Sequence, residues 1–393
     1  MFQKFFKKEE RALPVIFPSP INGIGTALNA YSHDRAAQLP TYLACESRIA
    51  EALASVPLRA FIVNENGSRA AMSDTPLATL LSEQVNDGMT AFEFRELLVR
   101  SILRHGNGYA LKSFDNSGQV INLTFLPATN ITIEQLPSGR LRYRYRTASG
   151  QTFVYLQDEI LHIRYASRDG VMGLSPLQLA APQIQLSLSL QNEAIKSSEN
   201  GFRSPSVLTI DKILTDAQRK TMRENLTTIG QSGQNLMVLE AGMKHERTAA
   251  SPAENEFVAQ LKLSDLAICR IMGVSPSVAG ITDNATYSNV ADESRAFVTR
   301  CLAPFAARIE ASLTMQLLTP AARKKQYIEH DLQGLLRGDM TSRYGAYKTA
   351  REAGFLSVNE IRKYENLSAI DGGDEYLRPL NHTIAGDPTT QAT

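Results

Sequence analysis

Six short strand-like runs follow one another between residues 108 and 165, and they constrain the fold more than any other feature of the chain. Each run is rich in β-branched and aromatic residues, and turn-forming segments such as DNSG, PSG and ASG separate them. This spacing is typical of antiparallel hairpins, so the sequence predicts a β-meander. The runs are GYALKSF, VINLTFL, ITIEQL, RLRYRYR, TFVYL and EILHIRY.

Amphipathic helices precede the predicted β-meander. Apolar residues recur at steps of three and four between residues 36 and 56, which predicts a helix with one buried face, and the strand LRAFIV follows it. Thr90 and Glu93 form a capping box for a second helix, which runs to about His105 and ends at Gly106.

Two long helices after the β-meander flank a small insert. Ser175 caps the first helix, whose pattern continues to Asn200, and Pro182 within it lacks an amide hydrogen and predicts a kink. The second helix starts near Ser251 and stops at Gly273. The insert between them contains the strand SVLTI, a short helix with its own capping box and the strand pair NLMVLE and MKHERT, which together predict a compact α/β unit.

The C-terminal third is mainly helical. A polar loop at 275–289 precedes a long helix to about Leu318, and Pro304 interrupts that helix. The strand QYIEH follows, then a helix that Gly354 ends and another that a capping box in SVNE begins. We expect the tail after Pro379 to be disordered.

Charge and hydropathy limit the classes of function. Lys plus Arg number 41 and Asp plus Glu number 40, for a formal net charge of +1, so any contact with DNA must be local or weak. The longest apolar stretch, 177–190, is broken by polar residues and predicts no membrane span. The start, MFQKFFKKEER, is too charged for a secretory signal.

The three cysteines lie far apart in the sequence and lack a C-x-x-C spacing. We interpret each of them as a small buried hydrophobe in a reducing compartment. They are Cys45, Cys269 and Cys301.

Four arginines share one face of the run RLRYRYR, because successive side chains of a strand point to opposite sides. The other face carries Leu141, Tyr143 and Tyr145. The arginine stripe has two interpretations: a solvated sheet face, or a surface for an acidic partner or passing phosphates. Its members are Arg140, Arg142, Arg144 and Arg146.

Two near matches to catalytic motifs have structural explanations. The segment GNGYALKS differs from a phosphate-binding loop by Leu111, where a glycine is needed, and Lys112 and Ser113 lie in a strand pattern instead of opening a helix. Ser175 lies in a near match to a nucleophile elbow that lacks its final glycine, and it is better explained as a helix cap.

Metal and carboxylate chemistry find no support in the residue spacing. The six histidines lack the spacing of metal ligands. The acidic pairs Asp158 with Glu159 and Asp292 with Glu293 fit a hairpin end and a helix start. The sequence therefore predicts no catalytic residues, no cofactor and no metal site.

Nine segments from about Thr41 to Leu380 together resemble the portal protein family of tailed phages, in the compact form of the Hong Kong 97 lineage. One departure is Ser275, where the family commonly has a proline before Pro276. The segments, in chain order, are GNGYAL, LPATNITI, EILHIRY, DGVMGLSPLQ, SPSVL, ICRIMGVSP, YSN, LAP, and GFLSVNEIRK with GGDEY.

The resemblance implies an α+β portal fold that forms a ring. Its parts are a β-rich wing, a two-helix stem, a small α/β clip, a tunnel loop with a long kinked helix, and a helical crown. The implied boundaries are a flexible N-terminal arm at 1–35, the wing at 36–174, the stem helices at 175–202 and 251–273, the clip at 203–250, the tunnel loop at 274–290, the long helix and return strand at 291–330, the crown at 331–382 and a disordered tail at 383–393.

By the same resemblance the chain is a ring-forming channel at one capsid vertex, through which double-stranded DNA enters and leaves. The implied partners are further copies of the chain in a twelve-membered ring, the DNA held without sequence preference, the large terminase subunit, a head-tail adaptor and the major capsid protein. No membrane and no cofactor are implied. The expected location is the virion, after assembly in the host cytoplasm.

A ring through which DNA slides must make few tight phosphate contacts, because each neutralised phosphate releases counterions and adds affinity. The expected tunnel loop fits this demand, since residues 275–289 contain no Lys or Arg and one acid; an ordinary surface loop is the alternative. The residues expected to line the channel are Ile281, Thr282, Asp283, Asn284, Ala285, Thr286, Tyr287 and Ser288. Arg219, Lys220 and Arg223 are expected to dock terminase or adaptor, and Arg140, Arg142 and Arg144 are expected to face the capsid.

Two other classes of protein remain as alternatives. A nucleic-acid enzyme, such as a nuclease or packaging ATPase, would need an intact phosphate loop or a carboxylate cluster. A structural ring or pore of a tail-like or secretion assembly would share the helices without handling DNA.

Overall fold

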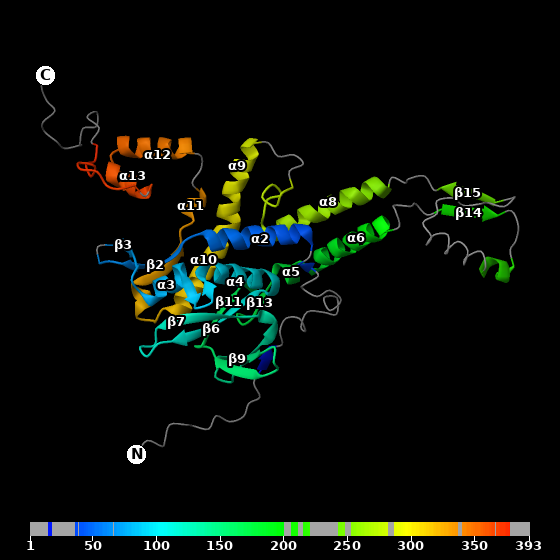
Figure 1. Cartoon of the computed structure of the whole chain (residues 1–393), viewed down its shortest axis with the longest axis horizontal. Coiled ribbons are helices and arrows are strands. Elements are labelled where there is room, and N and C mark those ends of the chain that lie inside the picture. Colours follow the sequence, from blue (N-terminus) through cyan, green and yellow to red (C-terminus); the bar gives the residue numbers. More distant parts are fainter. Residues whose placement is uncertain are drawn as a thin grey trace, which may run out of the picture.

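The computed structural model contains a body rich in strands, a two-helix arm that projects from it, and a group of helices close to the C-terminus (Figure 1). Helices and strands alternate irregularly along the chain, which confirms the predicted α+β class. The structure describes residues 15–17, 36–37, 39–65, 67–199, 206–210, 215–220, 243–247, 253–281, 287–336, 340–365 and 367–377.

The antiparallel helices α2 (Pro40–Ser55) and α4 (Ala91–His105) form the centre of the main core. The apolar stripe predicted for α2 is buried, from Tyr42 to Leu53, and it packs against apolar side chains of α4. The Tyr42 hydroxyl donates a hydrogen bond of 3.1 Å to the Leu103 carbonyl. Both helices were expected from their periodicity, and both are confirmed.

Gly106 ends α4 as predicted, and it is required for two physical reasons. Its φ of 76° lies in the left-handed region that favours glycine. A Cβ atom at this position would also lie 2.5 Å from the carbonyl oxygen of Gly173. The end of α4 is therefore pressed against the strand that leads into the arm.

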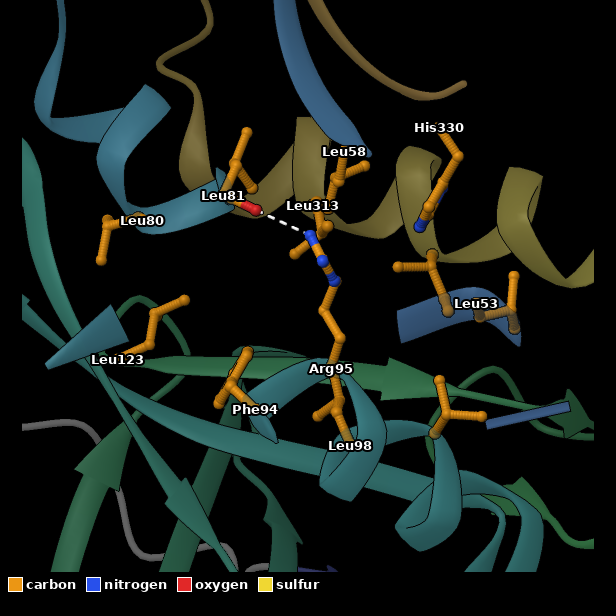
Figure 2. Close-up of a pocket in the computed structure, with 12 residues that line it drawn as sticks. Leu53, Leu58, Leu80, Leu81, Phe94, Arg95, Leu98, Leu123, Leu313 and His330 are labelled. Carbon is orange, nitrogen blue, oxygen red and sulfur yellow. Dashed lines mark hydrogen bonds between the residues drawn. The ribbon is translucent and has the colours of Figure 1, made fainter. Parts of the chain in front are cut away.

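Arg95 of α4 connects the carboxyl ends of two other helices (Figure 2). Its guanidinium donates hydrogen bonds to the carbonyls of Leu81, at 2.7 Å, and Ala54, at 2.6 Å. Leu81 lies in α3 (Pro76–Ser82) and Ala54 in the last turn of α2, where a positive charge interacts favourably with the helix dipole. Apolar side chains surround the stem of the arginine and leave a cavity of about 20 Å³.

The six predicted runs between 108 and 165 are all strands, but they do not form a meander. They divide between a three-stranded sheet, in the order β11-β6-β7, and a four-stranded sheet, in the order β1-β8-β9-β10. The prediction of consecutive hairpins is wrong at two places, because β7 does not pair with β8 and β10 does not pair with β11. The strands are β6 (Asn107–Phe114), β7 (Val120–Leu126), β8 (Ile131–Gln135), β9 (Leu141–Arg146), β10 (Thr152–Leu156) and β11 (Ile160–Arg164).

Burial explains why β11 does not pair with β10. Residues 160–163 of β11 are buried on both faces, whereas almost all of β10 is exposed on both faces. A strand covered on both faces must lie inside the body, and it pairs there with the buried strand β6. Between β7 and β8, Pro127 and the 3-10 turn η2 (Ala128–Asn130) separate the two sheets.

The N-terminal arm, expected to be flexible over residues 1–35, contributes a strand to the second sheet. β1 (Val15–Phe17) pairs antiparallel with β8, with Ile16 opposite Glu134. The expectation of a wholly flexible arm is therefore wrong for these residues, because their backbone pairs with the edge of the sheet.

A polar network lies where the two sheets meet. The His162 Nε2 proton is donated to Asn107 Oδ1 at 2.9 Å, and Nδ1 accepts from the Tyr143 hydroxyl at 3.2 Å. Asn107 Oδ1 also accepts from the Gly173 amide, and Asn107 Nδ2 donates to the Gly173 carbonyl. Burial, reinforced by the charge of Arg164, lowers the pKa of His162 well below its usual value, so the ring is neutral.

A small three-stranded sheet and two hairpins complete the described part of the body. β2 (Leu58–Val63) lies between β3 (Arg69–Ala71) and the return strand β16 (Gln326–His330), which was also predicted. The two remaining hairpins of the body are β4 (Gln84–Asn86) with β5 (Met89–Thr90), and β12 (Ala166–Ser167) with β13 (Gly173–Leu174).

The predicted long helix at 289–318 consists of α9 (Tyr287–Ala296), a π-helical turn η3 (Phe297–Leu302) and α10 (Ala303–Leu317). The change from π to α geometry occurs at Pro304, in the first turn of α10. Proline has no amide hydrogen to bond the preceding turn, so the expected interruption is confirmed. The 3-10 turn η4 (Ala322–Lys324) then leads into β16.

Three helices close the described chain: α11 (Gln333–Leu336), α12 (Met340–Glu352) and α13 (Val358–Tyr364). Gly354 follows α12 with a φ of 76°, and Ser357 and Glu360 form the predicted capping box. The expected disordered tail, 383–393, lies outside the described residues.

The three cysteines, distant in sequence, meet where α2, the second arm helix and η3 pack. Cys45 and Cys269 are buried, as expected, and Cys301 is half-buried. The hydrogen bond with Cys269, together with burial, raises the pKa of the Cys45 thiol. All three are free thiols. Among the described helices, none is both long and apolar enough to cross a membrane.

Candidate functional site

The projecting arm consists of α6 (Ala181–Glu199) and α8 (Ala253–Met272), which run side by side away from the body (Figure 1). Ser175 caps the short helix α5 (Pro176–Leu179) that precedes α6, as predicted. The chain breaks between α5 and α6 at Ala180, because Pro182 has no amide hydrogen for the preceding turn. The predicted kink is therefore confirmed.

Side chains from both helices hold the arm together and join it to the body. The Ser187 and Ser264 hydroxyls are hydrogen-bonded at 2.6 Å between the helices. At the base of the arm, Ile268 and Cys269 are buried against α2, and the Thr41 hydroxyl donates to Asp265 at 2.5 Å. These contacts fix the direction in which the arm leaves the body.

The outer sides of the arm expose large apolar residues. Leu186 of α6 is 51% exposed and Leu263 of α8 is 59% exposed. Leu186 lies two residues from the buried Ile184 and Leu188, which is about 200° around the helix. Leu263 precedes the buried Ile268 by five residues, about 140° around α8. Each helix of the arm thus carries an exposed leucine that the rest of the described chain leaves uncovered.

The sequence contains a signal for the exposed Leu186. Apolar residues that occur around the whole circumference of a helix indicate that more than one face is covered. The stretch 177–190 shows this pattern, since it is apolar on the face toward α8 and again at Leu186.

The insert at the end of the arm contains β14 (Ser206–Ile210) and β15 (Met243–Arg247), which pair antiparallel (Figure 1). Half of the predicted capping box is present, since Gln218 Oε1 accepts from both the amide and the hydroxyl of Thr215. Of the expected docking residues, Arg219 and Lys220 are exposed, and Arg219 lies 3.6 Å from Asp216. Arg223 and the strand NLMVLE lie outside the described residues.

The expected tunnel loop begins where Gly273 stops α8 with a φ of 69°. Residues 275–281 form tight turns, in which the Ile281 amide donates to the Pro276 carbonyl at 2.8 Å. The Ser277 hydroxyl donates to Glu293 of α9 and so joins the two ends of the loop. Thr282, Asp283, Asn284, Ala285 and Thr286 lie outside the described residues.

The structure corrects the C-terminal edge of the expected tunnel loop. Tyr287 and Ser288 were expected in the loop, but they form the first turn of α9. The half-buried side chain of Ile281 packs against the main core, and its expected place in the channel lining stays a prediction.

The arginine stripe has the predicted geometry, and two carboxylates partly neutralise it within the chain. Leu141 and Tyr143 are buried on the opposite face of β9, as expected. Glu134 of β8 is buried, and its carboxylate accepts from Arg142 Nε at 2.7 Å and pairs with Arg144 at 2.5 Å. Arg140 pairs with Asp158. Two carboxylates, Glu134 across the sheet and Asp158 in a turn, thus pair with the three arginines expected to face the capsid and compensate part of their charge.

The residues considered for catalysis have structural partners. Lys112 and Ser113 lie in β6, as the strand pattern predicted, and Ser175 is a helix cap. Glu159 accepts from the Leu156 amide, and Asp292 pairs with Arg295. Within the described ranges, no three His, Cys, Asp or Glu side chains are arranged to hold a metal ion.

Comparisons with known proteins agree with this architecture. A sequence model of the family described as Phage portal protein matches residues 40–366. The chain is 31% identical over 365 residues to the portal protein of Enterobacteria phage HK97, and the match covers 91% of this chain and 86% of the phage protein.

Two solved structures of gene transfer agent particles have a similar fold. A chain from the neck of the empty particle, computed with C6 symmetry, has a TM-score of 0.64 and 24% identity over 91% of this chain and 96% of that one. A chain from the neck of the native particle, computed with C12 symmetry, has a TM-score of 0.57 and 23% identity over 85% of this chain and 91% of that one.

The family match and the phage relative together define a structural protein of a virion. The family match covers most of the chain, and the relative in phage HK97 exceeds 30% identity. The chain therefore belongs to the phage portal protein family, which is structural and not enzymatic.

Proposed function

We propose that copies of this chain assemble side by side into a closed ring at one vertex of a capsid, and that double-stranded DNA passes through the ring during packaging and ejection. The observation that carries this proposal is the pair of exposed leucines, Leu186 on α6 and Leu263 on α8, which the rest of the described chain leaves uncovered. A subunit in a ring has a neighbour on each side, and a head-to-tail interface buries two different surfaces of each copy. Rotational symmetry in the necks of the similar particles supports the same arrangement, with twelve copies.

In this arrangement the segment after Gly273 faces the central channel. The nearly uncharged residues 282–286 then meet the DNA, and the contact between Ser277 and Glu293 holds the two ends of the loop together. The insert at the end of the arm docks the large terminase subunit and later a head-tail adaptor through Arg219 and Lys220. The β-rich body contacts the major capsid protein, and assembly takes place in the host cytoplasm.

The ring is tested by replacing Leu263 with Asp. A charged side chain at a buried interface is strongly unfavourable, so Leu263→Asp is expected to leave the protein monomeric at concentrations where the unchanged protein forms rings. Gln260→Asp adds the same charge at another exposed position of α8 and is expected to assemble normally. Mass photometry and negative-stain microscopy measure both outcomes.

The passage of DNA is tested separately in rings that assemble. Replacing Asn284 and Thr286 with Lys adds phosphate contacts to the channel and is expected to slow packaging and increase DNA retention. Packaging kinetics equal to those of the unchanged ring would favour a structural ring that does not handle DNA.

A further inference from the structure

A cleft of about 330 Å³ opens on the body between β6, β9 and the end of α10. Its lining comes from segments that are far apart in the sequence, including Lys112, Asp158, Arg164, Gln316 and Arg323. Gln316 fixes one wall, because its side chain accepts from the His162 amide at 2.8 Å and donates to the His162 carbonyl at 2.9 Å. The cleft is therefore built from rigid elements.

Three cations line this cleft, and none of them has a carboxylate partner among the described residues. Lys112 donates to the Gln316 carbonyl at 3.1 Å, and Arg323 donates to the Leu318 carbonyl at 3.1 Å. Arg164 donates to the Gly170 carbonyl. Main-chain carbonyls orient these side chains but carry no negative charge to compensate them, whereas several other arginines of the body pair with carboxylates.

Lys112 is the least exposed of the three cations, with 8% of its surface accessible. Its ammonium has three N–H groups, and the Gln316 carbonyl is the one acceptor found for it in the described part of the chain. Burial lowers the pKa of Lys112, and the charge of Asp158 opposes this effect. A buried ammonium with unused donors is costly unless an anion compensates it.

The one carboxylate in the lining supplies only part of that compensation, because Asp158 is also paired with Arg140 outside the cleft. The cations therefore give the cleft a net positive charge. Exposed apolar side chains lie beside them: Phe114 is 44% exposed and Met315 is 58% exposed.

This mixture of cations and apolar side chains fits a carboxylate group better than a DNA phosphate. An acidic side chain next to an apolar one, in the same peptide, can satisfy both kinds of surface. A duplex is far wider than a cleft of this size, and its sugars and phosphates would leave Phe114 and Met315 uncovered.

We propose that the cleft binds a peptide segment of a protein partner in which acidic and apolar residues are adjacent, with its carboxylates paired to Lys112, Arg164 and Arg323. The cleft lies within a single chain, so the proposal does not depend on ring formation or on passage of DNA. It also moves the expected partner surface of the body away from the arginine stripe, whose charges are partly compensated by Glu134 and Asp158.

The test uses the full chain and a fluorescein-labelled octapeptide of alternating glutamate and leucine, with binding measured by fluorescence anisotropy. A second peptide with glutamine in place of glutamate controls for apolar binding. We expect the glutamate peptide to bind and the glutamine peptide to bind at least about tenfold more weakly, because hydrogen bonds to charged groups are lost.

Two variants locate the site, and one variant controls for general charge. Lys112→Met and Arg323→Gln are each expected to weaken binding of the glutamate peptide by about tenfold. Arg323 is exposed, so its variant tests the site even where a change at the buried Lys112 disturbs folding. Lys324→Gln removes an adjacent exposed charge outside the lining and is expected to leave the affinity unchanged.

Three results would overturn the proposal. The first is equal affinity of the two peptides. The second is an equal loss of affinity in the Lys324 variant and in the two site variants. The third is that the glutamate peptide does not bind, whereas a DNA duplex binds and loses affinity in the site variants. The last result would assign the cleft to phosphate.

Discussion

Replacing Arg95 with Met tests the contact that joins α2, α3 and α4 at the centre of the body (Figure 2). The change removes two hydrogen bonds from a charged donor, each of which contributes roughly 1.5 to 3 kcal/mol. It also leaves the carbonyls of Ala54 and Leu81 without this donor at the ends of two helices. Burial also lowers the pKa of Arg95, because it disfavours the charged guanidinium. Methionine avoids this desolvation penalty, which offsets part of the loss. We expect a net loss of roughly 2 to 4 kcal/mol in the free energy of unfolding.

The assay is urea unfolding followed by circular dichroism, since the chain contains no tryptophan for fluorescence. Arg48→Met serves as the matched control, because Arg48 is exposed on α2, and we expect its effect to stay within about 0.5 kcal/mol. Hydrogen exchange should also increase in the last turns of α2 and α3 of the Arg95 variant. An Arg95 variant as stable as the control would refute the reasoning, because the cost of burying the charge would then equal the gain from its hydrogen bonds.

Two further predictions concern the junction of the sheets. The pKa of His162 is lowered in the folded protein, so the unfolded chain binds a proton first as the pH falls below about 6.5, and the free energy of unfolding should decrease from there. Urea midpoints at about pH 7.5 and pH 5 should therefore differ more in the unchanged protein than in His162→Gln, and equal differences would contradict a neutral buried ring. Gly106→Ala places a Cβ atom 2.5 Å from the Gly173 carbonyl and should lower the melting temperature far more than Gly118→Ala, where φ is also positive but no atom lies within 4 Å. Similar melting temperatures for the two glycine variants would show that backbone conformation, and not packing against Gly173, determines the loss of stability.

Signals that act over a few residues predicted the elements well. The capping box at Thr90, the stop at Gly106 and the interruptions at Pro182 and Pro304 are all present, because each depends on hydrogen bonds within one or two helical turns. The strands between 108 and 165 were also located correctly, since alternation and turn residues are local.

Pairing between distant segments could not be predicted in the same way. Periodicity identifies β10 and β11 as strands, but it does not reveal that one is exposed and the other buried, which decides their partners. The arginine stripe illustrates the same limit, because the carboxylate of Glu134 reaches it across the sheet. The cleft around Lys112 depends on α10, which is about two hundred residues away in the chain.

Cryo-electron microscopy of the assembled protein tests the central claim most directly. The account predicts a closed ring in which adjacent arms contact each other through Leu186 and Leu263, and in which residues 282–286 surround the central opening. Arms that point away from their neighbours, or a 282–286 segment on the outer perimeter, would contradict it.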